Sequence, residues 1–305
     1  MGYMFTMMNQ ARLEVGLEGL AVAERAYQHA SAYAKDRKQG RALGSRESSP
    51  IIDHPDVRRM LMTMKAYTEA MRGLAYDAVA AEDRHTNSTD EVVKAEAGDR
   101  IALLTPITKA WCTDRGVEVS SIGVQVFGGM GFVEESGAAQ FYRDSRITPI
   151  YEGTNGIQAL DLVMRKLPMR DGAVVASYLD EIAALDGPLA EAGDALDATR
   201  IGLASAVETV RTATDWLNAQ EDVAARMAGA TPYQEMLGTL AGGYYLARQA
   251  LAAADGADGD PWLAAKLVTS NFYALNLLPK VHGLADAVSA GSEVLFAVGD
   301  DLIGS

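Results

Sequence analysis

Apolar residues after His54-Pro55 recur at the spacing of one helix face. They are Val57, Met60, Leu61, Met64, Tyr67, Met71, Leu74 and Ala78. Side chains at i, i+3 and i+4 share one side of an α-helix, so this pattern predicts a buried stripe. Its methionines suit core packing better than contact with a cofactor. Long Ala-, Leu- and Met-rich segments, and only 9 prolines in 305 residues, extend this helical character along the chain.

The sequence therefore predicts an all-α protein, because no alternating strand pattern bounded by turn residues is present. We expect an up-and-down helical bundle followed by a second, smaller helical domain. Tyr244-Tyr245, Trp262 and the segment 271–273 are expected in the core or at the contact between the domains. Helices are predicted over 5–37, from Pro55 through Ala78, and over 88–127, 135–145, 154–166, 173–186, 192–218, 232–254 and 261–290.

The charge is unevenly divided. Residues 1–168 hold 20 Lys and Arg against 22 Asp and Glu, whereas residues 169–305 hold 7 against 19. The two parts meet at Leu167-Pro168, followed by Gly172, and Pro and Gly mark breaks between elements. We predict domains over 1–168 and 169–305. The formal net charge of −14 argues against nucleic-acid binding, which needs a basic surface.

Cysteine and histidine usage excludes further classes. A single Cys permits no internal disulfide, and the four His show no metal-ligand spacing, so we expect no metal site. No uncharged apolar run is long enough for a membrane span. The first basic residue is Arg12, which does not match a signal peptide. We expect a cytoplasmic protein.

Two segments suggest a ligand site. In Gln125-Val-Phe-Gly-Gly-Met-Gly-Phe132, glycines let the backbone approach a ligand, although Gly-Gly also serves as a helix C-cap. In the second segment, Glu152 lies between an apolar run and a helix start at Thr154. A carboxylate partly withdrawn from water suits abstraction of a carbon-bound proton. From spacing alone, a capping or solvated surface carboxylate is the favoured interpretation.

These segments resemble the carboxyl-terminal helical domain of the acyl-CoA dehydrogenase family. The matching strings are QVFGGMGF, FYRDSRI and IYEGTNGIQALDL, together with residues 8–12 and 34–39. The resemblance covers residues 3–167. Residues 169–305 resemble the additional domain of a longer bacterial branch, which includes methylthiopropionyl-CoA dehydrogenase-like enzymes.

The resemblance implies an FAD-dependent α,β-desaturation of an acyl-CoA thioester. Glu152 is the implied base for the α-proton, and the flavin takes the β-hydride. Some relatives carry the base near the position of Ala11, where this chain has no carboxylate. Implied substrate contacts are Asn9, often Asp in the family, and Arg12, with Gly153 close to the thioester.

Further residues are implied to hold FAD. Arg37 and Gln39 match contacts to the pyrophosphate and adenosine of a neighbouring subunit. Gln125 and Gly129 match adenine-side contacts, again across a dimer. Implied contacts beneath the flavin are Thr154 and Gly156, the latter often Gln in the family. The resemblance thus implies a homodimer or higher oligomer, with electron-transfer flavoprotein as acceptor.

The family's amino-terminal helical domain and middle β-domain have no counterpart here. We therefore expect this chain to be the last two of four domains, a fragment that is incomplete as an enzyme by itself. Two alternatives stay open: an acyl-CoA oxidase, which shares this core, and a non-catalytic helical interaction module.

Overall fold

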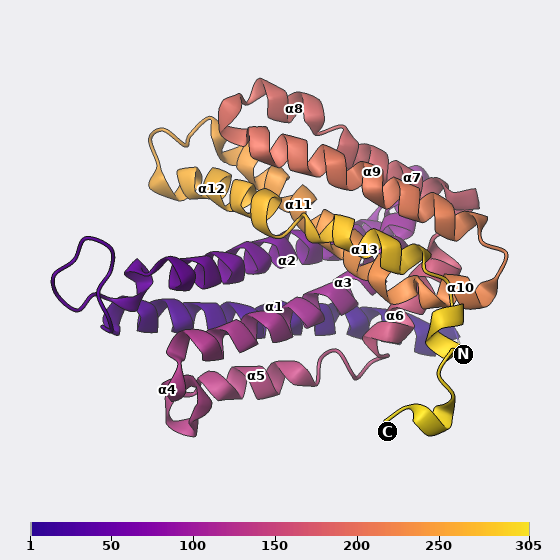
Figure 1. The fold of residues 1–305 in the computed structure, drawn as a ribbon. Helices are drawn as coiled ribbons and strands as arrows, with labels where there is room; N and C mark the ends of the chain where they lie inside the picture. Colours follow the sequence, from indigo (N-terminus) through magenta and orange to yellow (C-terminus); the bar gives the residue numbers. More distant parts are fainter. Residues whose placement is uncertain (1, 305) are drawn as a thin grey trace.

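Three long helices dominate the first half of the chain. Pro55 begins the second of them, where a missing N–H costs nothing, and Asp90 caps the third by accepting a 2.9 Å hydrogen bond from Val92 N. The helices pack side by side as an up-and-down bundle, which confirms the predicted fold class (Figure 1). The computed structural model describes residues 2–304, in which these helices are α1 (Gly2–Asp36), α2 (Pro55–Asn87) and α3 (Glu91–Phe127).

Three short helices complete this half. They are α4 (Gly129–Phe132), α5 (Ala138–Arg146) and α6 (Asn155–Asp161). α5 packs on α1 and α3, and α6 packs on α3. The helix predicted over 154–166 continues beyond α6 as a π-helical segment, Leu162–Lys166.

The second half is also helical, and its centre is the long helix α11. α11 packs on α9, α12 and α13 within this half, and on α2, α3 and α6 of the first half. No β-strand is present among residues 2–304. The helices are α7 (Ala173–Ala183), α8 (Asp186–Glu191), α9 (Asp197–Ala219), α10 (Val223–Ala228), α11 (Ala230–Ala254), α12 (Pro261–Asn276) and α13 (Lys280–Ser289).

Two expectations for this half are wrong. The helix predicted over 261–290 is divided into α12 and α13, and Pro279 stands at the break. Proline lacks an N–H and disfavours helical backbone in the residue before it, so an uninterrupted helix through this position is disfavoured. Trp262 is not part of the core, because it lies in the first turn of α12 with 65% of its surface exposed.

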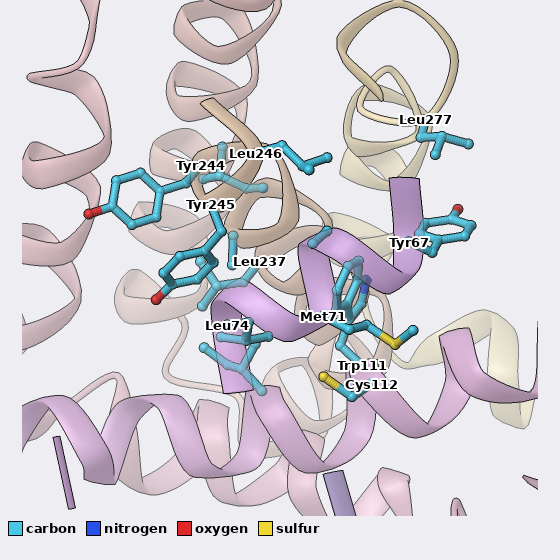
Figure 2. Close-up of a cluster of buried hydrophobic side chains, with 14 of the residues drawn as sticks. Tyr67, Met71, Leu74, Trp111, Cys112, Leu237, Tyr244, Tyr245, Leu246 and Leu277 are labelled. Carbon is cyan, nitrogen blue, oxygen red and sulfur yellow. The ribbon is translucent and has the colours of Figure 1, made fainter. Parts of the chain in front are cut away.

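One continuous core runs through both halves. The predicted stripe on α2 is confirmed, since Met64, Met71 and Leu74 are fully buried. Figure 2 shows this stripe facing Trp111 of α3 and the pair Tyr244-Tyr245 of α11. The same set of contacting buried side chains reaches into α9 and α13. The division at Pro168 stays a prediction.

Glycines let α11 approach α3 at Trp111, whose side chain is fully buried. A Cβ on Gly238 would collide with the indole of Trp111, and one on Gly242 would lie 2.8 Å from its Cη2 atom. Only a residue without a side chain fits at these two positions of α11.

A partly buried polar cluster adds to this contact. Arg100 of α3 donates to Asp77 of α2 and to Glu181 of α7, each at 2.6 Å. Tyr245 of α11 donates to the same Asp77 at 2.6 Å, and Tyr244 donates to Glu181. Tyr244 and Tyr245 thus lie at the contact between the two halves, as expected, and they both pack and form hydrogen bonds there.

Gly238→Ala should destabilise the chain, because a methyl group there would have to displace the indole of Trp111. We expect the free energy of unfolding to fall by about 1–3 kcal/mol. Urea unfolding followed by circular dichroism checks this. Gly283→Ala in α13 is the matched control, since a Cβ there meets nothing within 4 Å. The control should be neutral or slightly stabilising, and equal stability of the two variants would contradict the packing argument.

High pH should weaken the fold. Burial raises the pKa values of the Cys112 thiol and of the Tyr233, Tyr245 and Tyr273 phenols. Above pH ~10 these groups lose protons in the unfolded chain but keep them in the folded one, so stability falls as pH rises. Burial lowers the pKa of Lys109 to about 8. Between this pH and 10.5 the folded chain has lost the Lys109 proton that the unfolded chain keeps, so this group makes stability rise with pH.

We therefore expect the free energy of unfolding to fall above about pH 10, where the combined effect of the thiol and the three phenols exceeds the opposite effect of Lys109. Urea midpoints at about pH 8 and about pH 11 compare the two regimes. A midpoint that rises at the higher pH would show that these phenols are not buried in solution.

Candidate functional site

The predicted site residues form two separate clusters at opposite ends of α1. Arg12 lies near the amino end of this helix and Arg37 directly follows its carboxyl end. Twenty-five residues at 1.5 Å each put the two about 37 Å apart. In Figure 1, α6 lies toward the first of these ends and α4 toward the second. The chain therefore does not bring all of the predicted residues into one site.

The first cluster lines an open groove of about 580 Å³. Arg37 and Gln39 come from the connection between α1 and α2, and Gln125 and Gly129 come from the end of α3 and the start of α4. The four residues predicted to contact the pyrophosphate, adenosine and adenine of FAD thus share one groove. Further lining residues are Tyr33, Ile51, His54, Val57, Met60, Val126, Phe127, Gly128 and Met130.

Backbone hydrogen bonds fix the connection that carries Arg37 and Gln39. Ile51 N donates to Arg37 O at 2.8 Å, and Gln39 N donates to Ser49 O at 3.0 Å. The ring nitrogen Nε2 of His54 lies 2.8 Å from Gln39 O. The segment between Arg41 and His54 is therefore closed at its base, and both predicted residues stay at the groove.

The groove has the chemistry of a site for a flat, anionic ligand. The Arg37 guanidinium provides forked donors suited to phosphate, and the amides of Gln39 and Gln125 can donate or accept hydrogen bonds. A Cβ built on Gly129 meets nothing within 4 Å, so its backbone is open to a ligand. Sequence reasoning did not assign Tyr33 and Phe127, which stack with ring centroids 4.0 Å apart.

The second cluster surrounds Glu152, in the loop before α6. The loop is closed by a 3.0 Å hydrogen bond from Asn155 N to Pro149 O. Glu152 is half-buried and has φ +54°, a left-handed conformation that is strained for a residue with a side chain. Strained backbone of this kind is found at functional sites when the surrounding structure holds it in place.

Tyr151 attaches the loop to α1, because its hydroxyl donates to Glu18. Burial, followed by this hydrogen bond and the nearby carboxylates of Glu18 and Glu152, raises the pKa of Tyr151 to about 12. The phenol therefore stays protonated, and remains a donor, at neutral pH.

Gly153 brings the predicted substrate contacts together. Its φ is +83°, and a Cβ there would lie 2.9 Å from Gln158 Nε2 and 3.6 Å from Arg12 Nη2. Arg12 Nη1 in turn donates to Asn9 Oδ1 at 3.1 Å. Asn9, Arg12 and Gly153 therefore lie side by side next to Glu152. Both the conformation and the space require glycine at position 153.

Buried polar atoms without partners gather next to Gly153. Gln158 is fully buried, and neither its Oε1 nor its Nε2 has a hydrogen-bond partner among the described residues. The same holds for Arg12 Nε. Such atoms are rare because each costs free energy unless something binds to it. Sequence reasoning gave Gln158 no role, although it lies in the matched segment.

The two remaining predicted residues lie at the start of α6. Thr154 Oγ1 accepts a 3.2 Å hydrogen bond from Ile157 N and so caps this helix. Gly156 is exposed, in the first turn of α6. Their assignment as flavin contacts stays a prediction.

The described part of the chain contains neither a group of metal-ligating side chains nor a helix that could span a membrane. Among residues 2–304, no three His, Cys, Asp or Glu side chains are grouped so that they could hold a metal ion. Nor is any described helix both long and apolar enough to cross a bilayer.

Two family models match the sequence. Residues 1–167 match the C-terminal domain of acyl-CoA dehydrogenases, and residues 175–298 match the family described as acetyl-CoA dehydrogenase C-terminal like. A relative from Ruegeria pomeroyi, 3-methylmercaptopropionyl-CoA dehydrogenase, is 44% identical over 284 residues, which are 90% of this chain and 48% of the relative. The chain spans about half the length of the first curated relatives it matches.

Solved structures share the fold. An acyl-CoA dehydrogenase from Bacillus anthracis, complexed with FAD, aligns with a TM-score of 0.71 and 21% identity over 98% of this chain and 51% of its own. ACDH-11 from Caenorhabditis elegans, in complex with C11-CoA, aligns with a TM-score of 0.74 and 19% identity over 96% of this chain and 48% of its own. The match of residues 1–167 to the family model, together with these relatives, shows that the chain belongs to the acyl-CoA dehydrogenase family.

Proposed function

We propose that this chain provides the base and part of the cofactor site of an FAD-dependent acyl-CoA dehydrogenase. The observation that carries this proposal is the loop at Glu152. It holds the backbone of Glu152 in a strained conformation next to Gly153, and Gly153 lies against Arg12 and Gln158, whose side chains carry buried polar atoms without partners. A carboxylate so placed can remove a proton from a substrate whose carbonyl is held by neighbouring donors.

The substrate would be an acyl-CoA thioester. Glu152 takes the α-proton, and the Gly153 backbone N–H donates to the thioester carbonyl, which favours charge developing on that oxygen. Arg12 and Asn9 line the same place and orient the substrate. The substrate in the name of the relative at 44% identity, 3-methylmercaptopropionyl-CoA, supports the acyl-CoA class.

FAD fits the first cluster. The Arg37 guanidinium would bind its pyrophosphate, and Gln39, Gln125 and the open backbone at Gly129 would hold its adenosine. When bound, FAD supplies the acceptor for the β-hydride. Thr154 and Gly156 are the proposed contacts at the flavin end.

The separation of the two clusters supports a dimer. About 37 Å along α1 is longer than one FAD molecule, so the adenosine groove and the Glu152 loop of one chain would serve two different flavins. Each flavin would then take its base from one chain and its Arg37 from another. We propose a homodimer or higher oligomer on this ground.

The remaining parts of the proposal concern the cellular role. We propose fatty acid β-oxidation in the cytoplasm, with electron-transfer flavoprotein as the acceptor. The single cysteine, which is free, agrees with a reducing compartment.

Glu152→Gln should remove the base and keep the shape of the side chain. In the complete enzyme we expect turnover to fall by about 10²–10⁴-fold, the usual contribution of a general base. Bleaching of the flavin by acyl-CoA measures this step. Glu14→Gln is the control, because Glu14 is the first carboxylate after position 11 on α1 and is exposed. Normal turnover of Glu152→Gln would rule out this residue as the base.

Arg37→Met removes the guanidinium and keeps an unbranched apolar side chain. Loss of a charge-assisted hydrogen bond, worth about 1.5–3 kcal/mol, should weaken FAD binding by about 10- to 100-fold. Fluorescence titration of the complete enzyme with FAD measures the Kd. Arg46→Met, in the same connection but outside the groove lining, should leave the Kd unchanged. Equal Kd values for Arg37→Met and the unchanged enzyme would place the pyrophosphate elsewhere.

A further inference from the structure

Asn155, three residues after Glu152, joins the loop to α3 through both ends of its amide. Its Oδ1 accepts from Lys109 Nζ at 2.8 Å, and its Nδ2 donates to Asp114 Oδ1 at 2.8 Å and to Ala110 O at 3.1 Å. Thr113 Oγ1 lies 3.0 Å from Nδ2. All of these partners belong to α3, and none has a part in the proposed chemistry.

Lys109 is the unusual member of this group. Its side chain is fully buried, and Asn155 Oδ1 is within hydrogen-bond distance of its ammonium. Burial lowers its pKa to about 8, opposed by the carboxylates of Asp114 and Glu152 and assisted by the guanidinium of Arg12. Burying an ammonium is unfavourable unless its hydrogen bonds and neighbouring charges compensate, so a lysine here calls for a reason.

The loop needs such a contact. Glu152 holds a left-handed conformation that costs a residue with a side chain free energy, and this persists only when both sides of the residue are fixed. On the amino side, Tyr151 is attached to Glu18. On the carboxyl side, the backbone of Asn155 closes the loop onto Pro149 and its side chain fastens it to α3.

We propose that Lys109 is a positioning residue, which holds the loop Pro149–Asn155, and with it the conformation of Glu152, through its hydrogen bond to Asn155. Lys109 touches neither substrate nor cofactor in this role. The inference rests on the proposed function only for its effect on turnover, because the order of the loop can be measured without any reaction.

Lys109→Met keeps the length of the side chain and removes the donor. In the full chain we expect hydrogen–deuterium exchange of the amides in 150–158 to become about tenfold faster, as expected for loss of one buried hydrogen bond. Lys266→Met is the matched control. It removes another largely buried lysine, paired with Glu69 at 3.2 Å between α12 and α2, and should leave exchange in 150–158 unchanged.

Two further variants test whether Lys109 acts through Asn155. Asn155→Ala should loosen the same segment, and Lys109→Met should then add little to it, since the hydrogen bond between Lys109 and Asn155 is already lost. Lys109→Gln keeps an N–H donor without charge and should restore most of the protection. If Lys109→Met does not fold, Asn155→Ala and Lys109→Gln still carry the test.

In the complete enzyme, Lys109→Met should lower kcat about 10- to 100-fold and change KM by less than about twofold, because a misplaced base slows the chemical step. Exchange in 150–158 within twofold of the unchanged chain, or effects of Lys109→Met and Asn155→Ala that simply add, would overturn the positioning role. If Glu152→Gln keeps normal turnover while Lys109→Met loosens the loop, the base assignment fails and the positioning role stands.

Discussion

The close approach of α11 to α3 at Trp111 is the contact on which the arrangement of this chain depends. Gly238 and Gly242 leave room for an indole that no other residue at these positions would allow. This contact fixes the middle of α3, a helix that contributes to both candidate sites. Its middle holds the Glu152 loop through Asn155, and its carboxyl end provides Gln125 and leads into the glycines of the groove. A helix that turned about its axis would disturb both sites together.

The charge is distributed unequally between the half of the chain that carries the candidate sites and the half that does not. The half that carries the sites is close to neutral, and the acidic surplus lies in residues 169–305. Anionic groups such as a pyrophosphate or CoA would therefore meet Arg37 and Arg12 on the less acidic half. Part of the surplus is also compensated internally, since Arg100 of α3 binds Glu181 of α7. The whole-chain charge describes neither site.

The sequence predicted the helices well because their signals are local. The apolar stripe on α2 and the cap at Asp90 each depend on residues a few positions apart. Other features depend instead on segments that are distant in the sequence. They are the division of the site residues between the two ends of α1, the contact of Gly153 with Arg12, and the burial of Gln158. The burial of Lys109 could not be predicted from the sequence, because a lysine is usually placed at the surface. Its hydrogen bond to Asn155, a residue distant in the sequence, explains the burial.

The length of α1 has a meaning of its own. One helix carries Arg12, which is proposed to contact the substrate, near its start and leads to Arg37, which is proposed to contact the cofactor, just past its end. Each residue added or removed between them would turn one end by about 100° relative to the other and shift it by about 1.5 Å. Point substitutions along the exposed side of α1 can be absorbed, but a single-residue insertion or deletion cannot. The distance between Arg12 and Arg37 is thus set by the number of residues between them and hardly at all by the identity of those residues.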